Sequence, residues 1–149
     1  NSMKKIITYT ENQGSISDKQ NLPSKGTPNF LADSICYNAA KLAAHVDAKA
    51  IIVFTHSGYS AIRISSHRPK SKIFAFSNNQ KILQRLSLVW GIHPSYLKSY
   101  DHLDEAIPEA VKILKEQKIL KNGDCVVIVG SIPLNLRGRT NVMKVSYVE

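Results

Sequence analysis

Hydrophobic and polar positions divide the chain from residue 29 onward into strands and helices that follow one another in turn. Continuous apolar runs rich in β-branched residues, typical of strands covered on both faces, occupy residues 48–54, 72–76 and 125–129. Residues 92–97 and 141–147 predict two further strands, the last at a sheet edge. Helical spacing of apolar residues predicts helices over 29–46 and 60–67, a third from Asn79 to Gly91, and a fourth after 101–104.

Regular alternation of strand and helix predicts an α/β fold. We expect a three-layer αβα sandwich whose sheet has about five strands, mostly parallel, with an antiparallel edge strand. In the helix over 29–46, the small residues Ala32, Cys36, Ala39 and Ala43 share a stripe that would permit close packing on the sheet. Ligands of such sheets bind outside the carboxyl ends of the strands, so a functional site is expected at that edge.

The segment before residue 29 has a different character. Residues 4–9 are consistent with a short strand, and the stretch that follows, to Pro28, is rich in Gly, Ser, Asn, Gln and Pro. We therefore expect residues 1–28 to be an N-terminal arm, open to motion, and residues 29–149 to be one α/β domain. Asn1 and Ser2 ahead of Met3 resemble a cloning scar, and no apolar signal segment follows them, which favours a cytoplasmic protein.

Composition limits the classes of partner that the chain is expected to bind. The net charge of +9 indicates an anionic partner, a class that includes nucleic acid, acidic protein surfaces and phosphorylated metabolites. The lysines and arginines are scattered and not interleaved with aromatic residues, which argues against nucleic acid. No apolar run approaches the roughly 18 residues of a membrane span. Two cysteines, expected to be buried reduced thiols, and five histidines without ligand-like spacing predict neither a metal nor another cofactor.

The stretch that carries the clearest chemistry joins the 48–54 strand to the next helix. It consists of Thr55, His56, Ser57, Gly58, Tyr59 and Ser60. Backbone amides in the first turn of a helix lack intrahelical partners, and the helix dipole favours an anion there, so this stretch predicts a phosphate cup. An ordinary capped helix, in which the Thr and Ser hydroxyls satisfy those amides and nothing binds, explains the same residues.

Two other segments are expected at the same edge of the sheet. One holds Asn79, and the other is a long loop before the last strand that carries Arg137, Gly138, Arg139 and Thr140. Two guanidinium groups suit a phosphate because each can donate two hydrogen bonds to it, although solvated loop charges are the alternative. A catalytic set is not evident. Residue 62 is Ile where a nucleophile elbow requires glycine, and no acid is identified to orient His56.

Five blocks in order resemble the C-terminal α/β domain of pyruvate kinases: residues 48–60, 66–69, 76–81, 90–92 and 138–145. The resemblance implies a regulatory domain that helps to assemble a tetramer. In that family the catalytic site for phosphoenolpyruvate, ADP, Mg and K lies on a separate barrel domain, which nothing here resembles. The resemblance therefore implies that the chain does not carry out phosphoryl transfer by itself. It covers about residues 30–148, and because the arm before Phe30 does not resemble the segment that joins barrel and C-terminal domain, we expect a free-standing protein.

The resemblance also implies an effector pocket. The family's phosphate loop matches Thr55, Ser57, Gly58 and Ser60, and its last effector loop matches the region 138–141. The chain departs from the family at Ser131 and Asn135, where many bacterial relatives have glycine, and at Tyr59, whose ring would partly fill the pocket.

Three functions follow as hypotheses. The first is a non-catalytic domain that binds phosphate, sulfate or a phosphorylated metabolite such as a sugar phosphate, and that forms a homo-oligomer, a dimer or tetramer. The second is an assembly module that docks on itself or on a full-length pyruvate kinase, with a vestigial pocket. The third is a small enzyme acting on a phosphate ester with His56 as its base.

Overall fold

The computed structural model describes residues 1–13, 22–134 and 139–149. Its strands form one five-stranded sheet in the order β3-β2-β1-β4-β5. Strands β1 to β4 are parallel to one another, and β5 pairs with β4 in the antiparallel direction at the sheet edge. This confirms the predicted mostly parallel sheet with an antiparallel edge strand. The strands are β1 (Ala50–Phe54), β2 (Lys72–Ser77), β3 (Ile92–Tyr96), β4 (Cys125–Gly130) and β5 (Val142–Tyr147).

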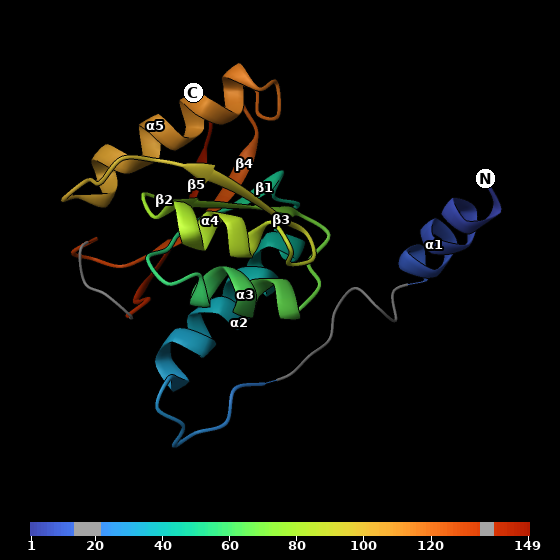
Figure 1. Ribbon diagram of the computed structural model, residues 1–149, viewed down its shortest axis with the longest axis horizontal. Helices are drawn as coiled ribbons and strands as arrows, with labels where there is room; N and C mark the ends of the chain where they lie inside the picture. Colours follow the sequence, from blue (N-terminus) through green and yellow to red (C-terminus); the bar gives the residue numbers. More distant parts are fainter. Residues whose placement is uncertain (14–21, 135–138) are drawn as a thin grey trace.

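Helices cover both faces of the sheet, which confirms the three layers (Figure 1). Helices α2 (Phe30–His45), α3 (Tyr59–Ser66) and α4 (Gln80–Leu86) lie on one face, and α5 (Leu103–Glu116) lies on the other. All five residues of β1 are buried because alternate side chains point to opposite layers. Ile51 and Val53 pack in the core beneath α2, α3 and α4, whereas Ile52 and Phe54 pack in the core beneath α5.

Helix α2 approaches the sheet through the predicted stripe of small residues. Cys36 and Ala39 are fully buried, whereas Leu31 at the start of the same helix is 76% exposed. Burial, and then the negative charge of Asp33, raise the pKa of the Cys36 thiol to about 12. Cys36 is therefore the buried thiol that the sequence predicted, while Cys125 is only half-buried, contrary to expectation.

Two of the predicted elements are wrong. Residues 4–9 belong to a helix, α1 (Ser2–Asn12), in which no residue is buried. A helix closes its own backbone hydrogen bonds, whereas a lone strand away from the sheet leaves them unpaired.

The helix predicted to run to Gly91 ends at Leu86. Beyond Leu86 the backbone turns more tightly, since the N–H of Leu88 donates to the carbonyl of Arg85 at 3.2 Å and that of Val89 to the carbonyl of Leu86 at 3.0 Å. This turn leads to Gly91, whose carbonyl already accepts from the N–H of Ile73 in β2 at 3.3 Å.

Candidate functional site

The turn between β1 and α3 lies at the carboxyl edge of the sheet, as predicted from the order of the elements. Gly58 precedes the helix with φ +82° and ψ −5°, a left-handed conformation that strains any residue with a Cβ atom. The hydroxyl of Thr55 accepts a hydrogen bond from the Gly58 N–H at 2.8 Å, and the hydroxyl of Ser57 accepts one from the Tyr59 N–H at 3.3 Å. Two amides of the predicted cup therefore have hydroxyl partners, as in a capped helix.

A cavity of about 170 Å³ opens beside this turn. That is the volume of about five or six water molecules, and it is smaller than the roughly 300–1,000 Å³ of pockets that enclose a whole drug-sized ligand. The cavity fits a phosphate group better than an entire sugar phosphate. The described residues that line it are Asn29, Phe54, Thr55, His56, Ser57, Tyr59, Ser60, Ser131, Arg139 and Thr140.

One contact joins the two sides of the cavity. The hydroxyl of Ser60, in the first turn of α3, is hydrogen-bonded to the hydroxyl of Thr140, 80 residues later in the chain. Arg139 lies next to Thr140 and is exposed, so its guanidinium can turn toward the cavity without breaking an ion pair among the described residues. The structure thus brings the predicted cup and the end of the predicted arginine loop together.

A polar cluster fixes the position of Tyr59. Its hydroxyl donates to the carboxylate of Asp33 at 2.5 Å, and Arg63 donates two hydrogen bonds to the same carboxylate at 3.0 Å each. Burial and then the hydrogen bond to Asp33 raise the pKa of the Tyr59 hydroxyl, and the same carboxylate raises the pKa of Arg63. Because Arg63 neutralises Asp33, this buried carboxylate repels an anion in the cavity less than a free one would.

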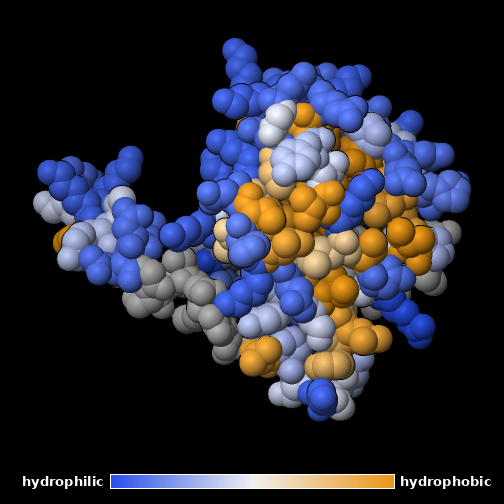
Figure 2. Space-filling model, turned by 180° about the vertical axis from the view of Figure 1, so that it is seen from behind, coloured by the Kyte–Doolittle hydropathy of each residue, from blue (hydrophilic) through white to orange (hydrophobic). Residues whose placement is uncertain are grey.

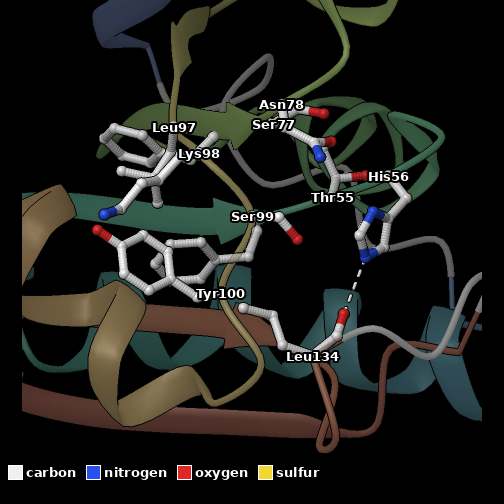
Figure 3. A pocket seen from close by; sticks show the side chains of 11 residues that line it. Thr55, His56, Ser77, Asn78, Leu97, Lys98, Ser99, Tyr100 and Leu134 are labelled. Carbon is white, nitrogen blue, oxygen red and sulfur yellow. Dashed lines mark hydrogen bonds between the residues drawn. The ribbon is translucent and has the colours of Figure 1, made fainter.

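His56 faces a second and smaller space. This cavity, of about 30 Å³, holds about one water molecule and lies between the ends of β1 and β2 and the segment 97–100 (Figure 3). Nε2 of His56 lies 2.8 Å from the carbonyl oxygen of Leu134. Since a carbonyl can only accept, Nε2 carries the proton here and cannot act as a base through that nitrogen.

The predicted residues therefore fall into three groups. Seven line the larger cavity: Thr55, His56, Ser57, Tyr59, Ser60, Arg139 and Thr140. Two lie elsewhere, since Gly58 forms the turn against Leu86 and Asn79 caps α4 by accepting from the Lys81 N–H at 3.1 Å. Arg137 and Gly138 lie outside the described residues.

Sequence reasoning missed five residues of this region. Asn29, Phe54 and Ser131 line the cavity, and Asp33 and Arg63 hold Tyr59. Asp33 and Arg63 are separated by 30 residues, so no local pattern connects them. The one available signal was Asp33, a charged residue beside the stripe of small residues that was predicted to pack on the sheet, because a buried charge requires a partner.

The described residues provide neither a metal site nor a membrane-spanning helix. Within the described ranges, no group of three or more His, Cys, Asp or Glu residues is placed to hold a metal ion. Among the same residues, no helix has both the length and the apolar character needed to cross a bilayer. The arrangement offers hydroxyls, backbone amides and a guanidinium, which are groups that bind an anion.

Comparison with known proteins gives a consistent result. The family model "Pyruvate kinase, alpha/beta domain" matches residues 33–146. The pyruvate kinase of Lactobacillus delbrueckii subsp. bulgaricus is 36% identical over 118 residues, which cover 79% of this chain and 20% of that protein. The pyruvate kinase of Clostridium acetobutylicum is 31% identical over 151 residues, covering 99% of this chain and 31% of that protein.

A crystal structure of a pyruvate kinase from Cryptosporidium parvum superposes with a TM-score of 0.74 at 26% identity. The match covers 85% of this chain and 24% of that one. The chain thus spans between about a fifth and a third of the length of the curated relatives named above. The alignment with the Clostridium acetobutylicum protein also includes the segment before residue 30, which the sequence resemblance had left out. The expectation of a free-standing protein rested on that segment being unlike the family, and this alignment removes its basis.

Proposed function

The chain belongs to the family of pyruvate kinase alpha/beta domains, and from that premise we propose that it is a non-catalytic, regulatory-type domain that binds phosphate or a phosphorylated metabolite. The site is the cavity between the 55–60 turn and Arg139. The observation that carries the proposal is the hydrogen bond between Ser60 and Thr140, because it holds the helix end and the basic loop on opposite sides of one cavity.

The dimensions of the cavity define what part of a ligand enters it. A phosphate group fits in about 170 Å³, while the rest of a sugar phosphate would extend toward the exposed Arg139. The hydroxyls of Thr55 and Ser57, which now accept from backbone amides, can rotate and donate to phosphate oxygens. That exchange would release the Gly58 and Tyr59 N–H groups toward the anion, where the helix dipole adds to their attraction.

Isothermal titration calorimetry tests this proposal with inorganic phosphate, sulfate and a panel of sugar phosphates. We expect at least one of these ligands to bind, and its binding heat to disappear when Ser57→Ala is combined with Arg139→Ala. The matched control is Arg85→Ala combined with Ser87→Ala, which removes the same side-chain types from the end of α4, away from the cavity. Absence of binding across the whole panel would overturn the proposal.

The second candidate is an assembly module, and the edge of the sheet favours it. Among the described strands, β5 pairs with β4 alone, and its Val145 and Tyr147 are 37% and 70% exposed. An edge strand with exposed apolar side chains is a template for pairing with another chain. One face of the α/β domain also carries a cluster of hydrophobic residues surrounded by hydrophilic ones (Figure 2).

Sedimentation of the chain alone, followed by binding assays with a purified full-length pyruvate kinase, tests this candidate. We expect a dimer or tetramer, or a complex with the enzyme, that is lost in Val145→Lys. A matched control is Ser146→Lys, which adds the same charge at the next position, on the opposite face of β5. A monomer that does not bind the enzyme would exclude this function while leaving the phosphate site to be judged by calorimetry.

A further inference from the structure

The segment between α5 and β4 contains the one asparagine of the sequence that is followed by glycine, Asn122. Asn122 and Gly123 are both exposed. Gly123 has φ +90°, and nothing lies within 4 Å of the position that a Cβ atom would take. Because glycine has no side chain to shield its backbone nitrogen, that nitrogen can approach the carboxamide carbon of the preceding asparagine. The pair is therefore a candidate for spontaneous deamidation.

A lysine outside the turn holds the carboxamide of Asn122. Nζ of Lys115, in the last turn of α5, donates to Oδ1 of Asn122 at 2.6 Å and to the backbone carbonyl of Glu149 at 2.7 Å. A charged donor on a carbonyl oxygen draws electron density from the carbon and stabilises the negative charge that develops when a nucleophile attacks. The contact with Lys115 therefore favours attack on Cγ of Asn122.

Two backbone hydrogen bonds, which we call the clasp, hold the nucleophile back. The N–H of Gly123 donates to the carbonyl of Val148 at 2.7 Å, and the N–H of Val148 donates to the carbonyl of Asp124 at 2.9 Å. The side chain of Val148 is 4% exposed and packs in the core beneath α5, which keeps the clasp closed. Since the nitrogen of Gly123 must give up its proton and turn toward Cγ, it reacts only while the clasp is open.

We propose that Asn122 is a deamidation site whose rate is set by the opening of the clasp. The backbone nitrogen of Gly123 gives its proton to hydroxide and attacks Cγ of Asn122. The new N–Cγ bond closes a succinimide ring while the Cγ–Nδ2 bond breaks, and the leaving group takes a proton from water and departs as ammonia. Water then adds to one of the two ring carbonyls and opens the ring to aspartate or isoaspartate. The net reaction consumes water and releases ammonia, with no oxidation or reduction.

Either product changes the contacts of the turn. Both place a carboxylate beside Nζ of Lys115, and an ion pair this near the surface adds little stability. In isoaspartate the main chain runs through the side-chain carbon, so an extra methylene separates residues 122 and 123 and moves the N–H of Gly123 away from the carbonyl of Val148. The neighbouring pair Cys125 and Tyr147, at the end of β5, then loses the support of the clasp. Isoaspartate at this turn therefore loosens the sheet edge.

Peptide mapping by chromatography and mass spectrometry tests the reactivity of the pair, first on the full chain unfolded in urea at mildly alkaline pH. We expect aspartate and isoaspartate to form faster at Asn122 than at Asn38, which precedes Ala39. Gly123→Ala should slow the reaction at Asn122 severalfold, because its Cβ atom shields the nitrogen. Equal rates at Asn122 and Asn38, or an unchanged rate in Gly123→Ala, would overturn the site.

The folded chain tests the clasp. Asn122 should react more slowly there than in urea, because the clasp is closed most of the time. Val148→Ala removes two buried carbon atoms that anchor the clasp and should raise the folded-state rate about tenfold, with no effect in urea. Hydrogen exchange of the Gly123 amide should rise by the same factor, since both processes require the same opening.

The matched control is Val127→Ala, which removes the same atoms from a fully buried position within β4. It lowers global stability without touching the clasp, so the folded-state rate at Asn122 should stay unchanged. Equal acceleration by Val127→Ala and Val148→Ala would show that the reaction follows global unfolding and would overturn the role of the clasp. A folded chain that reacts as fast as the chain in urea, or an unchanged rate in Val148→Ala, would overturn it as well.

Discussion

Gly58→Ala is the substitution whose cost the structure defines most closely. Gly58 has φ +82°, and an added Cβ would lie 3.1 Å from Cδ2 of Leu86 and 3.3 Å from Cγ2 of Ile82. The left-handed backbone alone costs an L-residue about 1–2 kcal/mol. Leu86 is 1% exposed and has little room to move, so crowding adds about 1–3 kcal/mol. We expect a loss of about 2–5 kcal/mol in the free energy of unfolding.

Gly123→Ala separates the two contributions. Gly123 has φ +90°, but nothing lies within 4 Å of the position of its Cβ. Its substitution should therefore cost only the backbone contribution of about 1–2 kcal/mol. Urea unfolding of the three proteins, followed by circular dichroism, measures the difference. Equal losses in the two variants would refute the packing argument, because both would then report backbone strain alone.

Three further predictions follow from the polar cluster, the buried thiol and the helix end. Asp33→Ala should lower the free energy of unfolding in urea by about 2–3 kcal/mol, less than the loss of a fully buried ion pair because the Arg63 side chain is 42% exposed. Tyr59→Phe removes one hydrogen bond to Asp33 and should lower it by about 1 kcal/mol. Equal losses in the two variants would contradict the role of Asp33 as the shared partner of Tyr59 and Arg63. Burial raises the pKa of the Cys36 thiol from 9.0 to about 12, so as pH rises above 9 the unfolded chain loses this proton before the folded chain does. The free energy of unfolding should therefore be about 1.4 kcal/mol lower at pH 10 than at pH 8. That part of the pH dependence should vanish in Cys36→Ala; an unchanged dependence would exclude the thiol as its source. Lys118→Gly should raise the free energy of unfolding by up to about 1 kcal/mol, and a loss above 1 kcal/mol would contradict strain at φ +57°.

Local patterns were sufficient for most of the fold. The run at residues 48–54 predicted a strand covered on both faces, and β1 is buried along its whole length. Such a run requires helices on both sides, whatever its neighbours are. The order of the elements then placed the 55–60 turn at the carboxyl edge. The predicted strand at residues 4–9 failed because its apolar positions fit a helix as well, and no sheet partner was available to decide between them.

The sequence by itself determined the strands, the fold class and the turn that carries the hydroxyls, because these depend on periodicity and on neighbouring residues. Tertiary structure alone decided which distant residues meet. Ser60 reaches Thr140 and Asp33 reaches Arg63 across 80 and 30 residues, and Asn79 is directed to its own helix instead of the cavity. Asp47, Arg68 and Lys118, which follow α2, α3 and α5, likewise meet at one edge of the sheet although they are far apart in the chain. Such meetings depend on strand order and helix placement, which no local pattern encodes.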